Sequence, residues 1–232
     1  MNADGKAGFV RAMFTRIAPR YDLMNSLMTL GRHHAWRRVA ARATTAAPEG
    51  PALDLATGTG DLALAIAEVS PARAVVGADF SEAMLAEARR KVGRTRTSIV
   101  LLAADALALP FADATFACVT SAFLLRNLAD LDRGLREMRR VTRQGGHVIA
   151  LEITQPSLPV FSSLFGVYFH RVVPLVGAVV AGDRSAYTYL PDSVARFVSP
   201  AELSEIMQQA GLRRVTYQLV GFRTVAIHTA VV

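Results

Sequence analysis

A glycine-containing turn is the first candidate for chemistry in this chain. Residues Leu53–Asp61 read Leu-Asp-Leu-Ala-Thr-Gly-Thr-Gly-Asp, with an apolar run before the turn and a helical pattern after it. Gly58 and Gly60 let the backbone pass close to a ligand because no Cβ stands in the way. The N–H groups that begin the following helix then face that ligand. Taken alone, this spacing also fits the dinucleotide fingerprint.

Three acids at the ends of three successive predicted strands narrow the choice of ligand. Asp54 precedes Gly58 by four residues, where a carboxylate suits an amino-acid ammonium and is unhelpful beside a pyrophosphate. Asp79 follows Gly60 by 19 residues, a position that suits both hydroxyls of a ribose. Asp105 can accept from an exocyclic adenine amine. An ammonium, a ribose and an adenine describe S-adenosylmethionine, although capping or turn formation is the alternative role for each single acid.

Alternating strand and helix patterns must position these residues. The expected strands are 52–56, 74–78, 98–103, 116–121, 147–153, 215–220 and 224–230, and the expected helices are 9–18, 22–44, 61–69, 81–92, 130–142 and 199–210. Such alternation predicts a parallel sheet with helices on both faces, and the last two strands predict an antiparallel pair. We therefore expect an α/β fold of the Rossmann-like class I methyltransferase type, with a mostly parallel seven-stranded sheet.

The N-terminal part of the chain differs in charge from the rest. Lys6–Arg42 hold eight basic residues and one acid, so their net charge of +7 equals that of the whole chain. We expect a basic helical segment over residues 1–48 and the methyltransferase domain over residues 49–232. A basic segment on a neutral body suggests an anionic partner, either nucleic acid or a membrane surface. A solvated helix face is the alternative.

Residues 155–182 form an apolar insert in that domain, and their only formal charge is Arg171. Their length would permit a membrane span. Pro159 and Pro174 are expected to break the segment, however, and His170-Arg171 would place a charge at its centre, where charge is costly. A hydrophobic lid or a pair of interfacial helices is therefore the expectation.

Composition excludes several classes of protein. Hydrophobic residues make up 52% of the chain and charged residues 19%, which excludes a disordered chain. Cys118 is the single cysteine, so an internal disulfide and a thiolate metal cluster are excluded. The five histidines show no metal-ligand spacing, and we predict no metal. Residues 1–8 lack the apolar core of a secretory signal, and we expect a cytoplasmic protein.

Further motifs are spread along nearly the whole chain. They are Met13-Phe14, Ile17-Ala18, Tyr21-Asp22, Met24-Asn25, Gly31, Trp36-Arg37-Arg38, Asp79-Phe80-Ser81, Met84-Leu85, Ala106-Leu107, Leu109-Pro110-Phe111, Arg126-Asn127, Ala186-Tyr187, Tyr189-Leu190-Pro191 and Ser193. With these motifs and the glycine turn, the chain resembles the quinone-biosynthesis C-methyltransferases, which methylate demethylmenaquinol or the ubiquinone precursor. The resemblance implies cofactor contacts at Thr59, Asp79 and the Asp105-Ala106 pair. It implies demethylmenaquinol as the acceptor.

The chain also departs from that family's pattern. Leu124 stands where glycine is usual, Ala117 where aspartate is common, and Gln144 where proline is usual. The family's basic C-terminal tail is missing. We expect Leu124 to border the substrate site, so this departure leaves open the possibility that the enzyme methylates another small aromatic acceptor.

The acceptor that the resemblance implies sets the catalytic task. Methyl transfer from a sulfonium is an in-line displacement, so the enzyme must align the acceptor carbon and make it electron-rich. Arg126 is the expected stabiliser of a quinol phenolate, with a surface salt bridge as its alternative role. We expect Asn127 to hydrogen-bond the second quinol oxygen and Tyr21 to pass a proton or pack on the ring. Asp183 and Tyr187 are weaker candidates.

Other functions remain as rivals. A nucleic-acid methyltransferase that modifies a base amine would carry Asn/Asp-Pro-Pro-aromatic where residues 121–127 read Ser-Ala-Phe-Leu-Leu-Arg-Asn, so we expect no nucleic-acid partner. A nicotinamide-dependent oxidoreductase and a non-catalytic binding module use the same glycine turn. We expect an isoprenoid quinol or another small aromatic substrate and peripheral contact with the inner face of the membrane. A homodimer is left open.

Overall fold

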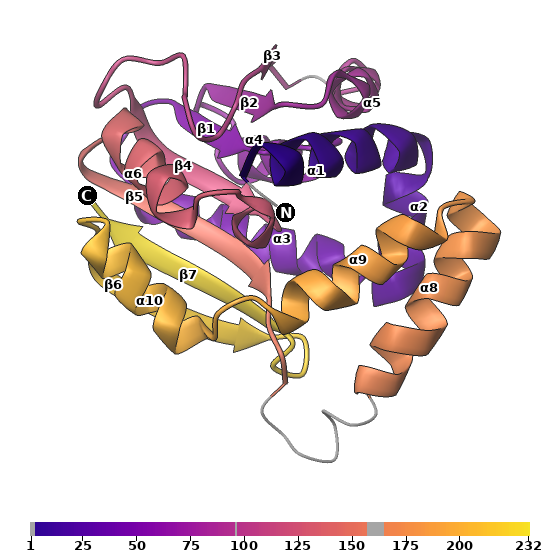
Figure 1. Ribbon diagram of the computed structural model, residues 1–232. Coiled ribbons are helices and arrows are strands. Elements are labelled where there is room, and N and C mark those ends of the chain that lie inside the picture. Colours follow the sequence, from indigo (N-terminus) through magenta and orange to yellow (C-terminus); the bar gives the residue numbers. More distant parts are fainter. Residues whose placement is uncertain (1–2, 96, 157–164) are drawn as a thin grey trace.

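A seven-stranded sheet forms the centre of the molecule (Figure 1). The computed structural model describes residues 3–95, 97–156 and 165–232. The strands are β1 (Ala52–Leu55), β2 (Val75–Asp79), β3 (Ile99–Ala103), β4 (Phe116–Ala122), β5 (Thr142–Ile153), β6 (Arg213–Val220) and β7 (Val225–Val231). Their order across the sheet is β3-β2-β1-β4-β5-β7-β6. Strands β1 to β5 are parallel, and β7 runs antiparallel to both of its neighbours.

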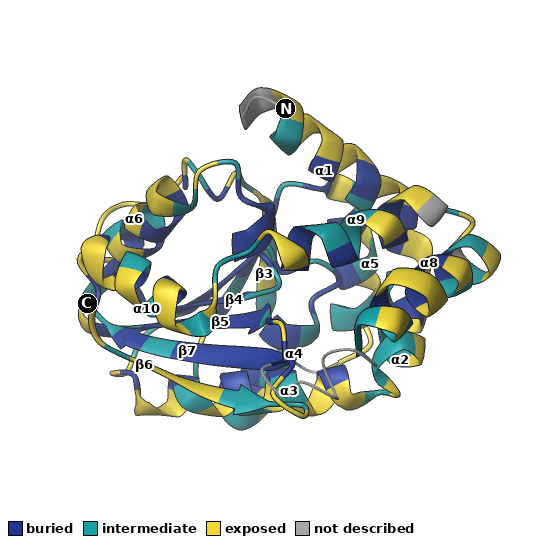
Figure 2. Ribbon diagram, turned by 60° about the horizontal axis from the view of Figure 1, so that its bottom comes forward, coloured by how far each residue is buried: buried dark blue, intermediate teal, exposed yellow. Residues whose placement is uncertain are grey.

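Helices cover both faces of this sheet, as the strand–helix alternation predicts. The helices of the core are α3 (Arg32–Ala43), α4 (Asp61–Val69), α5 (Glu82–Val92), α6 (Leu131–Val141) and α10 (Pro200–Gln209). Side chains of α3 and α4 pack with Ile149 and Leu151 of β5, whereas side chains of α6 and α10 pack with Val148 and Ala150. Successive strand residues point to opposite faces, so one strand serves two cores. The central strands are accordingly buried (Figure 2).

A second layer of helices lies beyond the carboxyl ends of the strands (Figure 1). It contains α1 (Ala3–Ile17), the 3₁₀ turn η1 (Ala18–Arg20), α2 (Tyr21–Thr29), residues 165–181 and α9 (Arg184–Ala195). These elements share a third apolar cluster, which includes Met13, Met24, Phe169 and Tyr187. The basic N-terminal segment is therefore packed onto the domain.

The structure corrects three sequence predictions. The helix expected over 22–44 is two helices, because Leu30 and Gly31 have φ values of 50° and 73° and end α2 before α3 begins. Strand β5 begins at Thr142, and the double glycine lies within it. Pro174 does not break the insert, since the backbone on either side of it is helical, with π-helical segments η4 (Tyr168–Val172) and η5 (Gly177–Ala181) flanking α8 (Val173–Val176).

The structure also bears on the predictions for α4, α5 and the apolar insert. Helix α4 has the predicted bounds, and Ser81 caps α5 by accepting from the backbone of Met84. Helix α9 was not predicted, and it contains Pro191, a residue type that is uncommon inside helices. Pro159 lies outside the described residues. No helix within the described ranges is both long enough and apolar enough to cross a bilayer.

Candidate active site

A cleft lies against the glycine turn, where β1, β2 and β3 end. Ala56, Gly58, Asp79, Asp105 and Ala106 line it. Gly58 and Gly60 have φ values of 57° and 85°, which favour glycine. The position of a Cβ on Gly58 has no atom within 4 Å, so the turn leaves an open cradle there. Gly58 of the predicted turn therefore lines a cleft, and its contact with a ligand stays a prediction.

Asp79 is the central carboxylate of this cleft. One of its oxygens accepts from the backbone N–H of Gly58 at 2.8 Å, and the other accepts from the backbone N–H of Ser81 at 2.8 Å. Burial raises the pKa of Asp79 to about 6, although these hydrogen bonds act in the opposite direction. The carboxylate thus joins the glycine turn to the end of β2, and its contact with a ribose stays a prediction.

Asp54 lies behind the turn and does not line the cleft. It is 1% exposed, and its two oxygens accept from the hydroxyls of Thr57 at 2.6 Å and Thr120 at 2.8 Å. Burial raises its pKa to about 6. An ammonium contact at Asp54 therefore stays a prediction, and the hydrogen bonds observed here fix the shape of the turn.

Thr59 is turned toward the N-terminal segment. Its hydroxyl donates to Asp22 of α2 at 2.6 Å and accepts from Lys91 of α5 at 3.0 Å. Neither Thr59 nor Gly60 lines the cleft. The cofactor contact that the resemblance implies at Thr59 also stays a prediction, whereas its hydroxyl ties the glycine turn to α2.

Asp105 and Ala106 line the cleft on the β3 side. One carboxylate oxygen of Asp105 accepts from the backbone N–H of Leu107 at 2.9 Å, so the residue forms a turn as well as facing the cleft. Leu124 also lines this cleft and is 9% exposed. It does not line the larger cavity described next, and its expected place beside the substrate stays a prediction.

A larger cavity of about 680 Å³ adjoins the cleft. Its walls come from α1, α2, the insert and α9, with the ends of β5 and β7 as a floor, and most of the lining side chains are apolar or aromatic. Phe14, Tyr21, Phe123 and Asn127 line both spaces. The apolar cavity and the cleft therefore meet at these four residues, which include two of the sequence-predicted catalytic residues.

Arg126 enters the cavity from the 3₁₀ turn η3 (Leu125–Asn127), directly after β4. Arg126 does not form a surface salt bridge, which was its alternative role, because the residue is 9% exposed and donates to the buried Glu152 at 2.8 Å. Its guanidinium also lies over the ring of Phe123, with Cζ at 5.6 Å from the ring centroid. Burial raises the pKa of Glu152, and the Arg126 cation opposes that shift.

Asn127 is fixed by two hydrogen bonds. Its amide Nδ2 donates to the carbonyl of Phe123 at 2.9 Å, and its Oδ1 accepts from the hydroxyl of Tyr189 at 3.1 Å. Sequence reasoning gave no role to Tyr189 or Glu152. The signal for Glu152 was present in the sequence, since a single acid in the apolar strand Ala150–Ile153 requires a buried partner.

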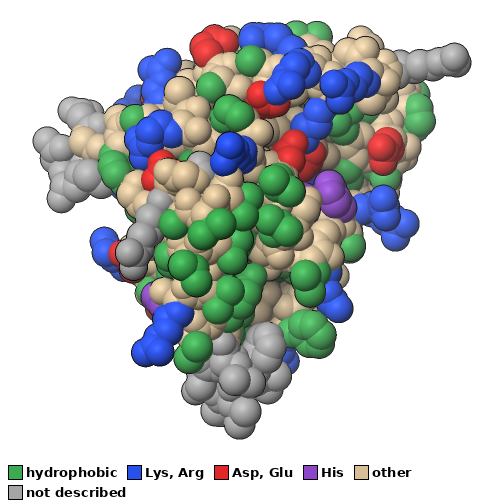
Figure 3. Space-filling view, turned by 90° about the vertical axis from the view of Figure 1, so that its right-hand side faces the viewer, with side chains coloured by type: hydrophobic (Ala, Val, Ile, Leu, Met, Phe, Trp, Pro, Cys, Tyr) green, Lys and Arg blue, Asp and Glu red, His purple; other side chains and the backbone are tan. Residues whose placement is uncertain are grey.

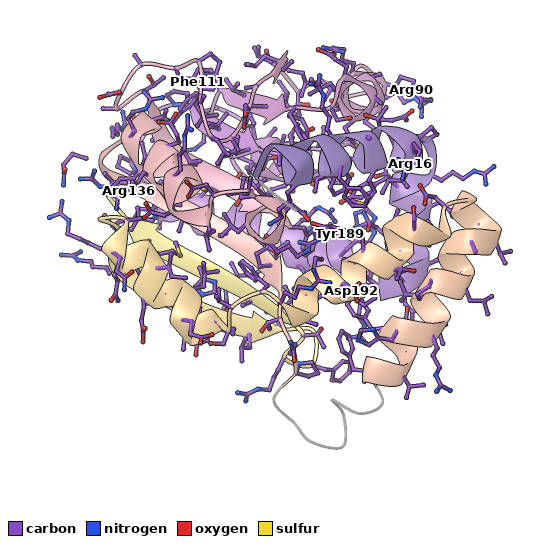
Figure 4. The ribbon with its side chains drawn as sticks, in the orientation of Figure 1. Arg16, Arg90, Phe111, Arg136, Tyr189 and Asp192 are labelled. Carbon is purple, nitrogen blue, oxygen red and sulfur yellow. The ribbon has the colours of Figure 1, made fainter. Side chains whose placement is uncertain are left out.

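The view with side chains shows the upper and lower walls of this region, α1 above and α9 below, with Tyr189 pointing between them (Figure 4). Lys6 of α1 donates to the carbonyls of Arg126 at 3.2 Å and Leu128 at 2.5 Å. At the other end of α1, Arg16 pairs with Asp183 at 2.9 Å. Asp183 caps α9, so its role in this structure is to hold elements together.

His33, His34 and Asp61 form a cluster that sequence spacing did not indicate. Their ligand atoms lie within 4.8 Å of one another. The Arg37 guanidinium donates to His33 Nδ1 at 2.5 Å, and Lys91 pairs with Asp61. Burial and the Arg37 cation lower the pKa of His33 to about 4. Two cations already occupy this cluster and oppose a divalent ion, and the absence of a metal stays a prediction.

Solved structures with the same fold support the assignment of class. A SAM-dependent methyltransferase from Thermotoga maritima aligns with a TM-score of 0.66 at 19% identity, covering 95% of this chain and 98% of that one. The [4+2]-cyclase SpnF aligns with a TM-score of 0.63 at 19% identity, covering 85% and 80%. Because that neighbour is a cyclase, these similarities show the fold alone.

The curated relatives are closer in sequence. A demethylmenaquinone methyltransferase from Roseiflexus castenholzii is 45% identical over 98% of this chain and 95% of its own length. One from Thermus thermophilus is 46% identical over 93% and 98%. The ubiquinone/menaquinone biosynthesis C-methyltransferase UbiE from Geobacter sulfurreducens is 41% identical over 95% and 87%.

The strand order β3-β2-β1-β4-β5-β7-β6, with β7 antiparallel, and the solved structures that align with it define the class I methyltransferase fold. Within this class the family model described as the ubiE/COQ5 methyltransferase family matches residues 2–232. The chain belongs to the ubiE/COQ5 methyltransferase family.

Proposed function

We propose that this enzyme methylates a ring carbon of an isoprenoid quinol, with demethylmenaquinol as substrate and menaquinol as product. The observation that carries the proposal is the meeting of two spaces, a cleft that holds the carboxylates of Asp79 and Asp105 and a 680 Å³ apolar cavity. They meet at Phe14, Tyr21, Phe123 and Asn127. An aromatic ring with a long apolar tail fits such a cavity. The names of the curated relatives support the same substrate class.

The cleft residues suit S-adenosylmethionine. Asp79 would hold the ribose, Asp105 and Ala106 would face the adenine, and the turn at Gly58 would let the methionine part approach the backbone. Asp54 would orient the ammonium end of the cofactor from behind the turn. The cofactor supplies a methyl group on a positively charged sulfur, which is a good leaving group.

The residues at the junction would activate the acceptor. Arg126 would stabilise the quinol oxygen as a phenolate, which makes the adjacent ring carbon nucleophilic. Asn127 keeps its second amide hydrogen for a ring oxygen, and Tyr21 lies where it can pack on the ring or pass the hydroxyl proton. After the C–C bond forms, the ring carbon loses its hydrogen as a proton and aromaticity returns.

A panel of acceptors tests this function. The enzyme is incubated with labelled S-adenosylmethionine and with chemically reduced naphthoquinones and benzoquinones. Label in the ring of a naphthoquinol supports the proposal, label only in a benzoquinol indicates the ubiquinone precursor, and label in neither overturns it. A thermal-shift comparison of S-adenosylhomocysteine with NAD(H) separates the oxidoreductase alternative, because a ligand that binds the native state raises the midpoint.

A long isoprenoid substrate resides in the bilayer, and we propose that the enzyme docks on the inner face of the membrane. Exposed apolar side chains gather on α2 and the insert: Leu23, Leu27, Leu30, Val167, Val172, Leu175 and Val179. Figure 3 shows this apolar patch with basic side chains around it. Leu27, Leu30 and Val172 also line the 680 Å³ cavity, which is called the acceptor cavity from here on, so the patch is continuous with the lining of that cavity.

The surrounding charge favours an anionic surface. Arg20, Arg32, Arg38 and Arg171 are exposed, whereas Arg37 is 5% exposed and pairs with Asp61 at 3.8 Å. Arg37 is therefore a structural residue and not part of the docking charge. The protein would be cytoplasmic and reversibly bound. The homodimer stays a prediction, which sedimentation velocity can measure.

A further inference from the structure

Three buried donors in the acceptor cavity have no hydrogen-bond partner among the residues that the structure describes. They are the hydroxyl of Tyr187, the amide Nδ2 of Asn25 and Nε of Arg126, and all three residues line the cavity. Tyr187 is 3% exposed. Buried polar groups are normally paired, so a donor left without a partner in an otherwise apolar cavity indicates the place of a ligand oxygen.

Tyr187 is held firmly in position. Its ring packs on Gly177 of the insert so closely that a Cβ on that glycine would clash with it. Burial raises the pKa of Tyr187, and nearby Tyr21 and Asp183 add to the shift. The hydroxyl therefore keeps its proton at neutral pH and is available as a donor.

Asn25 is placed beside the same region. It follows Tyr21 by four residues on α2, and residues four apart share a helix face. Tyr21, Asn25 and Tyr187 all line the acceptor cavity. The Asn25 amide is consequently one helical turn from a residue that shares this cavity with Tyr187.

Tyr187 and Tyr189 reach different parts of the cavity. Tyr187 and Tyr189 are two positions apart on α9, and side chains with this spacing on an α-helix point about 200° apart. The Tyr189 hydroxyl donates to Asn127, which lines both spaces, whereas the Tyr187 hydroxyl has no partner among the described residues. The cavity thus has two separate polar groups, one made by Asn127 and Tyr189 and a second one at Tyr187.

We propose that the Tyr187 hydroxyl, assisted by the Asn25 amide, binds the second oxygen of a 1,4-dihydroxy aromatic acceptor, the one farther from the methylated carbon. This inference rests on the proposed function and names the feature of the acceptor that the enzyme recognises. Arg126 and Asn127 then serve the oxygen beside the reacting carbon, which revises the role expected for Asn127. Tyr187 is a specificity residue in this arrangement.

The test compares two small acceptors that differ by one oxygen. Dissociation constants for 1,4-dihydroxynaphthalene, kept reduced under anaerobic conditions, and for 1-naphthol are measured with the wild type and with Tyr187→Phe. The single hydroxyl of 1-naphthol goes to the guanidinium, because charge-assisted hydrogen bonds are the stronger ones. We expect Tyr187→Phe to weaken binding of the diol about tenfold and to leave 1-naphthol within about twofold.

Tyr168→Phe is the matched control. The hydroxyl of Tyr168 lies on a cavity-lining residue but already donates to the carbonyl of Met28 at 2.8 Å. Its loss should affect both compounds equally. Thermal unfolding of each variant checks that it is folded.

Each outcome decides the matter. The inference is overturned if Tyr187→Phe weakens binding of both compounds equally, or if it leaves binding of the diol unchanged. In either case, methylation of the diol by the wild type still supports the proposed function. A wild type that neither binds nor methylates the diol overturns both. Weaker binding of the diol alone supports the binding of the second oxygen by Tyr187. Asn25→Ala should then weaken binding of the diol and leave binding of 1-naphthol unchanged.

Discussion

Glu152 accepts a hydrogen bond from Arg126 at 2.8 Å in a region where both side chains are almost excluded from solvent. The other oxygen of Glu152 accepts from the backbone N–H of Leu125 at 2.6 Å. One acid in β5 therefore holds both the guanidinium and the turn that carries it. The position of Arg126 in the acceptor cavity depends on a residue that does not itself line that cavity.

Glu152→Gln should lower the free energy of unfolding by about 3–5 kcal/mol, because it leaves the buried Arg126 cation without its counter-ion. Urea denaturation measures the change. Asp132→Asn is the control, since Asp132 pairs with Arg136 at 2.7 Å on the surface and such pairs contribute about 1 kcal/mol or less. Equal, small effects of both substitutions would show that the buried pair contributes little.

Removal of the Arg126 charge should lower turnover at least ~100-fold with little change in cofactor affinity, because a charge stabiliser acts on the transition state. Arg126→Met is best combined with Glu152→Gln, so that no unpaired charge stays buried. Glu152→Gln alone is the reference. Single-turnover rates and calorimetry provide the two measurements, and near-normal turnover in the double variant would remove Arg126 from the mechanism.

The affinity of the enzyme for its cofactor should fall as the pH is lowered from 8 to 5. The pKa values of Asp79 and Asp54 are both raised to about 6. A carboxylate that accepts from ribose hydroxyls must be ionised, so binding is fully developed above pH 7 and weakens as the pH falls through 6. Each such acid contributes a loss of up to about tenfold per pH unit. Calorimetry with S-adenosylhomocysteine from pH 8 to 5 measures this slope.

Asp79→Asn should weaken that binding by about 1–3 kcal/mol at pH 8 and should reduce the acid slope by one proton. Asp113→Asn is a control for the loss of a carboxylate, because Asp113 pairs with Arg140 at the surface and lies outside the cleft. An unchanged affinity in a folded Asp79→Asn protein would contradict the ribose role.

Binding to anionic vesicles should occur at low salt and should be lost at high salt. Each basic residue near such a surface contributes about 1 kcal/mol, so a variant with Arg32→Gln and Arg171→Gln should bind roughly 30-fold more weakly. The control carries Arg213→Gln and Arg214→Gln, which remove the same charge from the exposed start of β6. Equal weakening in both would indicate net charge and not a docking surface, and vesicle flotation distinguishes these results.

The central sheet could be predicted from the sequence because its strands are buried on both faces and appear as apolar runs. Helix α4 and the cap of α5 followed from local signals, namely the glycine turn and Ser81. The break between α2 and α3 could not be predicted in the same way. It requires a left-handed backbone at Leu30, which is uncommon for such a residue.

The candidate site shows the same division. Asp79, Gly58 and Asp105 could be placed because strand ends and turns are local in sequence. A single acid in an apolar run indicates that Glu152 needs a buried partner, but the sequence does not identify that partner as Arg126 and does not indicate the contact of Tyr189 with Asn127. These contacts arise only when β5 and α9 meet the turn after β4. Likewise, the basic count in the N-terminal segment could not reveal that Arg37 is buried, because burial depends on the packing of α3 against α4.

Helix α1 lies on both ligand spaces at once, with Val10 on the cleft, Met13 on the acceptor cavity and Phe14 on both. It is tethered at one end by Lys6 and at the other by Arg16. A displacement of this one helix would widen the cleft and the cavity together. Under the proposed function, entry of the methyl donor and release of the methylated product would then depend on the same helix, so exchange of one ligand would be coupled in time to exchange of the other.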